Sequence, residues 1–237
     1  MRLHLISALT PGLAYFNPTT SPPPLRRRYH VASPPRSSSG SVSLFLNSQL
    51  DPSQPHAHDE LALLGKTILA PQHVTTHYIN RAAVFIYSVV GNGVVLGLVL
   101  DKATAFSVGE MTNDSLVRSG VSDNVLYSGG GEGDDALVFL HDVETIRGAV
   151  NVGGGLFVGG SVSDMLKFGE EESDRFKFFF GHVELNVGEL DEWDVVSYSH
   201  GVGVGKDVVL GDYYDAGDCW TMLRKKMRMC SNSTENL

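Results

Sequence analysis

The sequence predicts a mixed α and β fold, in a single domain over residues 57–237 that follows an N-terminal leader over residues 1–56. Nine of the ten prolines lie before residue 56. Two apolar runs flank Gly-Asn-Gly, which indicates a β-hairpin. Two segments match the pattern of a serine followed three residues later by an acid, which marks helix starts. The domain is long enough to bury a sizeable core.

The leader has the composition of an organellar transit peptide. Residues 1–50 contain five arginines, nine serines and seven prolines but no Asp or Glu, and this balance is typical of targeting segments. Its proline runs exclude regular core elements. We expect the plastid stroma as the destination, with the mitochondrion as the alternative and a two-step plastid route as a third. An ordinary disordered tail stays open. A secretory signal is disfavoured, because the apolar stretch 3–9 is short and interrupted.

The charge of the remaining chain argues against nucleic acid as a partner. Residues 57–237 keep 13 of the 18 Lys and Arg residues and 26 of the 27 Asp and Glu residues, so they carry a formal charge of −13. Such a surface repels phosphate backbones. No apolar stretch reaches the length of a membrane span, so we expect none. Cys219 and Cys230 form no CxxC motif, which fits a reducing compartment.

The first half of the domain is expected to begin with strands. A short apolar run, Thr67–Ala70, ends at Pro71 and predicts a strand that stops there. The runs Ala82–Val90 and Val94–Leu100 predict the hairpin. Neither run alternates cleanly between apolar and polar residues, so we expect both faces of the hairpin to be covered.

The second half is expected to combine strands with short helices. Ser107 with Glu110, and Ser161 with Asp164, predict two helix starts. A last helix is expected from Asp218, with Trp220, Leu223 and Met227 on one face. The remaining predicted strands are Asn124–Ser128, Ala136–His141, Gly155–Val158 and Arg175–Val183.

Six segments, in their order and spacing, resemble one known family: Gly65–Pro71, Gly97–Lys102, Leu126–Gly130, Gly155–Gly160, Arg175–Gly181 and Gly188–Leu190. The resemblance is to the AlgH/YqgE family, small uncharacterised proteins shared by bacteria and plastid-bearing eukaryotes. It implies a single α+β domain with a large, curved, mostly antiparallel sheet flanked by helices. It implies no established catalytic residues.

The chain departs from the family pattern at three places. The family's Gly-Tyr-Ala-Gly-Trp stretch is Gly181–Leu185 here, without the tryptophan. A glutamine common in the family is Glu189. The Asn-Arg/Lys-Pro that follows the hairpin is Asp101–Ala103.

A loop rich in glycine and acids is the candidate ligand site. Three carboxylates lie within Gly129–Asp135, and we single out Gly129, Gly130, Asp134 and Asp135. Oxygen ligands on a flexible backbone could hold Ca²⁺ or Mg²⁺. The spacing of an EF-hand is missing, so we favour an ordinary acidic turn.

Two histidines are the candidate metal ligands. His73 and His77 have a zinc-like spacing only if a helix places them on one face. The glutamate of the metalloprotease pattern is missing, because Val74 follows His73. We favour ordinary surface histidines.

The other motifs lack parts that their chemistry needs. Gly201–Lys206 imitates a phosphate-binding loop, but His200 stands at the first glycine position and Asp207 at the Ser/Thr position. Gly153–Gly160 imitates a dinucleotide fingerprint without the following helix. Ser128 lies outside a nucleophile elbow. We therefore predict no catalytic residue and no cofactor.

Three functions stay open on the sequence. The first is a non-catalytic regulatory or protein-interaction domain in an organelle, with Tyr213 and Tyr214 at its interface. The second is a small-ligand or metal-dependent enzyme that gathers Gly129–Asp135 with His73 or His141. The third is a transcriptional regulator, which the acidity disfavours and only the basic stretch Arg224–Arg228 supports.

Overall fold

The computed structural model describes the backbone of residues 4–5, 30–31, 57–111, 116, 119–196 and 205–234. The predicted leader therefore lies outside the described residues, apart from a parallel pair of two-residue strands, β1 and β2. The elements, in chain order, are β1 (His4–Leu5), β2 (His30–Val31), α2 (Ala57–Leu63), β3 (Thr67–Leu69), β4 (Ala83–Gly91), β5 (Val94–Val99), β6 (Ala103–Ser107), α3 (Val108–Met111), β7 (Val125–Ser128), β8 (Glu132–His141), β9 (Val150–Gly153), β10 (Leu156–Val158), α5 (Val162–Met165), η1 (Glu170–Arg175), β11 (Phe176–Asn186), η2 (Val187–Glu189), β12 (Asp194–Val196), α6 (Lys206–Val209) and α7 (Asp218–Thr234).

One sheet organises the described part of the chain. The sheet has ten strands. Eight follow the order β12-β3-β4-β5-β11-β8-β10-β9, while β7 also pairs with β11 and β6 pairs with β7. Only the β7–β11 pair of this sheet is parallel. The expectation of an α+β domain with a large, mostly antiparallel sheet and short helices is therefore confirmed.

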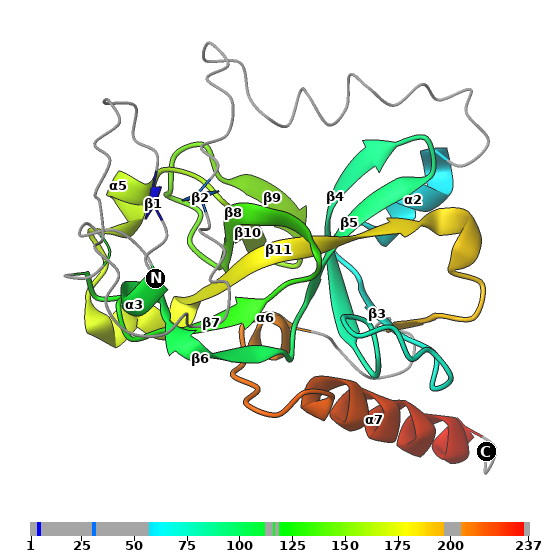
Figure 1. The fold of residues 1–237 in the computed structure, drawn as a ribbon. Helices are drawn as coiled ribbons and strands as arrows, with labels where there is room; N and C mark the ends of the chain where they lie inside the picture. Colours follow the sequence, from blue (N-terminus) through cyan, green and yellow to red (C-terminus); the bar gives the residue numbers. More distant parts are fainter. Residues whose placement is uncertain are drawn as a thin grey trace, which may run out of the picture.

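Strand β11 joins the two halves of the molecule (Figure 1). Its first part, Phe176–Phe180, pairs with β8 on one side and β7 on the other. Its last part, Val183–Asn186, pairs with β5. Because side chains alternate along a strand, Phe176 and Phe178 enter one core cluster and Phe179 enters the other.

The predicted hairpin is present. Gly91, Asn92 and Gly93 all have positive φ, at 97°, 57° and 81°, which is the conformation that Gly and Asn tolerate in such turns. On β4, Phe85 packs into one core cluster while Val84 packs into another on the opposite face. Both faces are covered, as the lack of alternation predicted.

Three strands were not predicted, and one starts earlier than expected. Nothing in the sequence pattern had indicated β6, β9 or β12, and β8 begins at Glu132 instead of Ala136. The expectation that the acidic segment is a turn is thus wrong from Glu132 onward. The pairing of Glu132 with His182 on β11 extends the strand through residues whose composition favours a loop.

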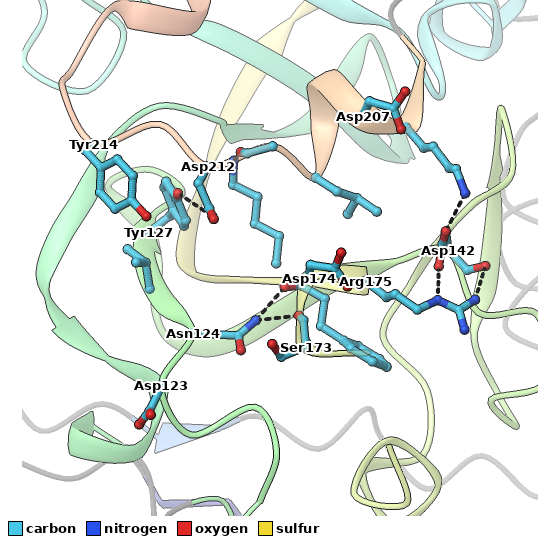
Figure 2. A pocket seen from close by; sticks show the side chains of 16 residues that line it. Asp123, Asn124, Tyr127, Asp142, Ser173, Asp174, Arg175, Asp207, Asp212 and Tyr214 are labelled. Atoms are coloured by element: carbon cyan, nitrogen blue, oxygen red, sulfur yellow. Dashed lines mark hydrogen bonds and ion pairs between the residues drawn. The ribbon is translucent and has the colours of Figure 1, made fainter. Parts of the chain in front are cut away.

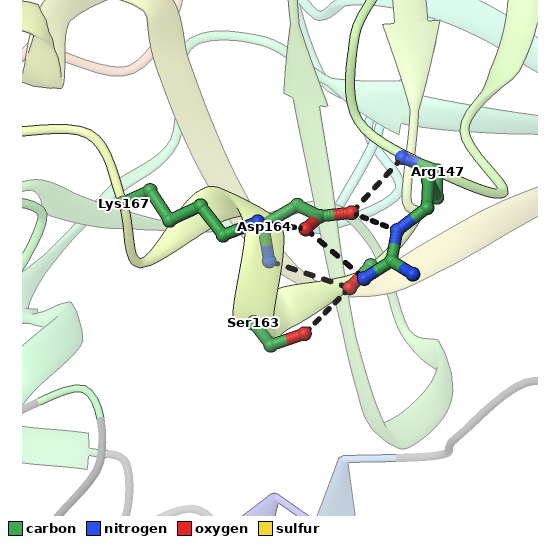
Figure 3. A network of polar contacts seen from close by, with 5 residues as sticks. Arg147, Ser163, Asp164 and Lys167 are labelled. Carbon is green, nitrogen blue, oxygen red and sulfur yellow. Dashed lines mark hydrogen bonds and ion pairs between the residues drawn. The ribbon is translucent and has the colours of Figure 1, made fainter.

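The two predicted helix starts are present. At α3, the Ser107 amide donates to the Glu110 carboxylate at 2.8 Å, and the Glu110 amide donates to Oγ of Ser107 at 3.4 Å. At α5, the Asp164 amide donates to Oγ of Ser161 at 3.3 Å. The Asp164 carboxylate binds Arg147 and Lys167 instead of the Ser161 amide (Figure 3).

Helix α7 begins at Asp218 and packs its apolar face on the core. Cys219, Trp220 and Leu223 are buried there, with Met227 at the edge. The Trp220 indole donates from Nε1 to the Ala70 carbonyl at 2.8 Å, and its amide donates to Asp101 at 3.2 Å. Trp220 therefore ties the helix to the end of β3. The predicted helix and its apolar face are confirmed.

Replacing Trp220 with phenylalanine should destabilise the protein by about 1–3 kcal/mol, because the buried indole bond is lost and volume is removed. Urea unfolding followed by circular dichroism measures the change. The matched control is Trp193→Phe, since Trp193 lies only at the edge of its core cluster. Equal losses at the two positions would contradict the role given to Trp220.

Among the described residues, no helix is both long enough and apolar enough to cross a membrane.

Candidate functional site

A cleft of about 490 Å³ lies where β7, the start of β11 and the segment around α6 meet (Figure 2). Its walls come from residues 123–127, residues 173–177, residues 206–214 and Asp142. The volume is in the range of small-molecule sites. Four separate parts of the chain build it, so its geometry depends on the complete fold.

An ion-paired carboxylate forms one side of the cleft. The Asp142 carboxylate accepts from Nε of Arg175 and from Nζ of Lys206, both at 2.7 Å. Burial would raise the pKa of Asp142, but the hydrogen bonds from Lys206 and Arg175 outweigh it and hold that pKa below its usual value. Asp142 therefore keeps its charge, and it fixes both cations at the cleft.

The rest of the cleft presents unpaired carboxylates. Asp123, Asp174, Asp207 and Asp212 are exposed there, and none has an ion-pair partner among the described residues. With Asp142 already neutralised by two cations, these groups give the opening a negative potential. The cleft therefore attracts neutral or positively charged ligands rather than anionic ones.

The least expected wall residue is Lys177. It alternates with Phe176 and Phe178 on β11, so it points to the face on which Phe179 is buried, and it is 2% exposed. Its Nζ lies 4.1 Å from the ring centroid of Tyr127 and 4.7 Å from that of Tyr213. It donates to the Gly211 carbonyl. No carboxylate of the described residues lies within ion-pair distance.

The surroundings of Lys177 weaken its hold on the proton. Burial lowers the pKa of Lys177 to about 7, although Cys219, Asp212 and Asp101 oppose the shift. Burial likewise raises the pKa of Asp101 to about 6, although the Trp220 amide and Lys177 oppose the shift. Shifted pKa values of this kind concentrate at functional sites, although buried structural groups show them too.

A tyrosine and an aspartate connect Lys177 to the opening of the cleft. The Tyr127 hydroxyl donates to Oδ1 of Asp212 at 3.2 Å and accepts from the Tyr213 amide at 3.1 Å. Burial and the nearby Asp212 raise the pKa of Tyr127, so the phenol keeps its proton. Figure 2 shows Tyr127 and Asp212 facing each other on the same side of the cleft as Tyr214. The Tyr127 hydroxyl therefore links Asp212 to the backbone of Tyr213, whose ring lies beside Lys177.

The sequence-predicted glycines lie outside this cleft and are packed tightly. Gly129 and Gly130 are buried where the chain passes from β7 to β8 close to β11. A Cβ on Gly130 would lie 2.0 Å from the His182 carbonyl oxygen, and one on Gly129 would lie 2.4 Å from that of Gly181. The structure thus gives both glycines a packing role. Their ligand-binding role stays a prediction.

The two acids of the same candidate site lie on a strand. Asp134 and Asp135 belong to the backbone of β8, while their side chains lie outside the described residues. His141, proposed as their companion, lies at the opposite end of β8. It is buried among Phe139, Phe157 and Phe176, donates to the Gly159 carbonyl and accepts from the Val143 amide. These contacts give His141 a packing role, while its part in a ligand site stays a prediction.

The two candidate zinc ligands do not share a helix. His73 and His77 lie in turns and are exposed. Nε2 of His73 lies 3.1 Å from the Glu192 carboxylate, whereas His77 stacks its edge on Tyr78. In the described part of the chain, no three His, Cys, Asp or Glu side chains gather to hold a metal ion. The metal role of this pair stays a prediction.

Three further residues can be placed. Cys219 is a free, fully buried thiol whose pKa burial raises to about 12, so it is not a nucleophile. Tyr214 is 70% exposed at the cleft, while Tyr213 is half-buried against Lys177. Most of the imitation phosphate loop, residues 201–204, lies outside the described residues.

Lys177 was not among the predicted site residues, although a signal was present. One lysine stands inside the run Arg175–Phe180, where the alternation of a strand places it on the same face as Phe179. A lysine at an interior position of an apolar strand is unusual. The remaining cleft residues carry no such local signal, because they come together only through the fold.

This chain is similar to known bacterial proteins. An AlgH-like family model matches residues 67–202. A UPF0301 protein of Chlorobium phaeobacteroides is 27% identical over 155 residues, which are 64% of this chain and 80% of that protein. The solution structure of the AlgH protein of Pseudomonas aeruginosa has a TM-score of 0.46 at 12% identity, and the match covers 73% of this chain and 87% of that one. The crystal structure of DIP2367 from Corynebacterium diphtheriae has a TM-score of 0.45 at 15% identity, and the match covers 62% and 82%.

Proposed function

The chain belongs to the AlgH-like family of uncharacterised function, and on that premise we propose that it is a non-catalytic regulatory domain that binds a small molecule in the cleft and a protein partner at its rim. The observation that carries the proposal is the cleft itself. It has the volume of a small-molecule site, and fixed charges and a buried amine line it. Tyr214, 70% exposed beside it, supplies an aromatic contact of the kind enriched at protein interfaces.

The ligand follows from the charges of the cleft. Asp142 holds Arg175 and Lys206 in place by two 2.7 Å contacts, so these cations are already paired. The free carboxylates then favour a polar ligand that is neutral or cationic and donates hydrogen bonds. A ligand bound there contacts residues 206–214, which include Tyr214. Ligand binding therefore affects the surface proposed to bind the protein partner.

Ligand screening by thermal unfolding tests this function. One class of neutral or cationic metabolite should raise the midpoint of the wild-type protein, and Asp142→Asn should remove most of that increase. The matched control is Asp164→Asn. Asp164 also accepts from two cations, Arg147 at 2.7 Å and Lys167 at 2.6 Å, but lies outside the cleft (Figure 3). Equal responses of the two variants to the ligand would overturn the cleft as the site.

The proposed subcellular location is the plastid stroma, with the mitochondrion as the alternative. The support is the acid-free, Ser- and Arg-rich composition of residues 1–50, which is typical of organellar targeting segments. Residues 1–56 fused to a fluorescent protein should direct it to plastids in leaf cells. Fluorescence in mitochondria would favour the alternative, and fluorescence in the cytosol would overturn both.

A further inference from the structure

Lys177 has an environment that packing alone does not explain. A fully buried lysine is costly, because its charge loses hydration and gains no carboxylate partner here. A methionine would fill the same space without that cost. Two tyrosine rings within 5 Å of Nζ offer a cation–π cage, which would stabilise the protonated amine. Burial nevertheless lowers the pKa of Lys177 to about 7, so much of the amine is neutral at pH 7.

Lys177 also lies beside the cleft. Lys177 is itself part of the cleft wall, and its Nζ donates to the carbonyl of Gly211, another wall residue. A buried lysine that is neutral and borders a ligand site is the arrangement used for imine formation with carbonyl compounds.

We propose that the cleft captures an uncharged or positively charged aldehyde or ketone as a reversible imine on Nζ of Lys177. This inference rests on the proposed function, for which it names the ligand class. The exposed carboxylates Asp123, Asp174 and Asp207, together with Asp212, exclude carbonyl compounds that carry a carboxylate of their own. Capture and release of the ligand need no turnover.

The chemistry balances without any further reactant. The Nζ lone pair of Lys177 attacks the carbonyl carbon, and one proton moves from nitrogen to the carbonyl oxygen to give a neutral carbinolamine. The second nitrogen proton then moves to the hydroxyl, which leaves as water, and the C=N bond forms. No electron is gained or lost, and hydrolysis reverses the reaction. The Tyr127 hydroxyl and the Asp212 carboxylate, 3.2 Å apart, supply and accept the protons.

Reductive trapping tests the proposal on the full chain. The protein is incubated at pH 7 with glycolaldehyde or with glyoxylate, two aldehydes of the same length that differ in charge. Cyanoborohydride then reduces any imine, and peptide mass mapping gives the rate at each lysine. With glycolaldehyde, Lys177 should be modified at least about tenfold faster than the exposed Lys225 and Lys226, because burial lowers the pKa of Lys177 to about 7 and leaves much of its amine neutral at pH 7. Glyoxylate should modify Lys177 much more slowly than glycolaldehyde.

Two variants keep the outcome interpretable. Lys177→Arg should lose the fast adduct. If that variant does not fold, Tyr127→Phe leaves the amine in place, removes the proton relay to Asp212 and should slow trapping at Lys177 alone. Modification that simply follows exposure, with Lys177 the slowest lysine, would overturn the imine. If ligands still protect the cleft in thermal unfolding while Lys177 gives no adduct, imine formation is wrong and the proposed function stands. If protection is also missing, both are wrong.

Discussion

Replacing Gly130 with alanine should unfold the protein or destabilise it by at least about 4 kcal/mol, a loss reserved for a severe structural conflict. The ideal Cβ lies 2.0 Å from the carbonyl oxygen and 2.1 Å from the carbonyl carbon of His182. Both are backbone atoms of the sheet, so neither can rotate away as a side chain would. Relief requires that β7 and β11 move apart, which breaks the bond from the Gly129 amide to the Phe180 carbonyl.

The matched control is Gly169→Ala. Gly169 has a φ of −85°, and no atom lies within 4 Å of the position that a Cβ would take there. Alanine at this position should therefore change stability by about 0.5 kcal/mol or less. Urea unfolding of the two variants gives the comparison. A Gly130→Ala protein as stable as the control would show that the backbones approach less closely than 2.0 Å implies. It would also remove the packing explanation for the glycines, whose ligand-binding role stays a prediction.

Elements with a local signal could be predicted from the sequence. The hairpin was predictable because Gly91–Gly93 supplies positive φ between two apolar runs, and the end of β3 because Pro71 follows. Prediction failed for β9 and β12, which have four and three residues. Strands this short are defined by the neighbours they pair with, not by their own periodicity. β8 begins within glycine and aspartate for the same reason, since pairing with β11 overrides composition.

The candidate site shows the same limit. Lys177 was visible as one cation in an apolar strand, and Tyr127 as a strand residue. Nothing in the sequence placed Asp142, some 35 residues before Lys177, on the other wall of the same cleft. The glycine-rich segment attracted attention because Gly and Asp are common in ligand loops. Here Gly129 and Gly130 let two backbone segments approach closely, and this packing requirement also selects glycine.

The stability of the wild-type protein should rise with pH between about 7 and 9.5, relative to a Lys177→Met variant. The pKa of Lys177 falls from 10.5 in the unfolded chain to about 7 in the folded protein. Between these values the unfolded state binds one proton more than the folded state, so the free energy of unfolding increases with pH. One group gives a slope of about 1.4 kcal/mol per pH unit. Below pH 7 both states are protonated and the full cost of the buried charge remains.

Lys177→Met lacks the titrating amine, so its free energy of unfolding should not show this slope. The variant should be more stable than the wild type by the largest margin at pH 7 and below. Urea unfolding at steps of half a pH unit measures the difference. Asp101 does not contribute to the pH dependence of stability above pH 7. Its folded pKa of about 6 lowers stability as pH rises towards 6, but above pH 7 it is ionised in both states. Lys225→Met, which removes an exposed amine, should run parallel to the wild type.

Parallel curves for wild type and Lys177→Met would mean that Lys177 keeps its proton in the fold, held by the rings of Tyr127 and Tyr213. The amine would then be a structural cation, and it could not attack a carbonyl group at neutral pH. A difference with the expected sign shows instead that the fold releases a proton from Lys177. The free energy of unfolding is then lowest, relative to Lys177→Met, below pH 7. The cause is the buried charge of a group that packing does not require. A lysine that costs stability without improving packing indicates a functional use of its neutral amine. The cleft beside Lys177 is the place for that function.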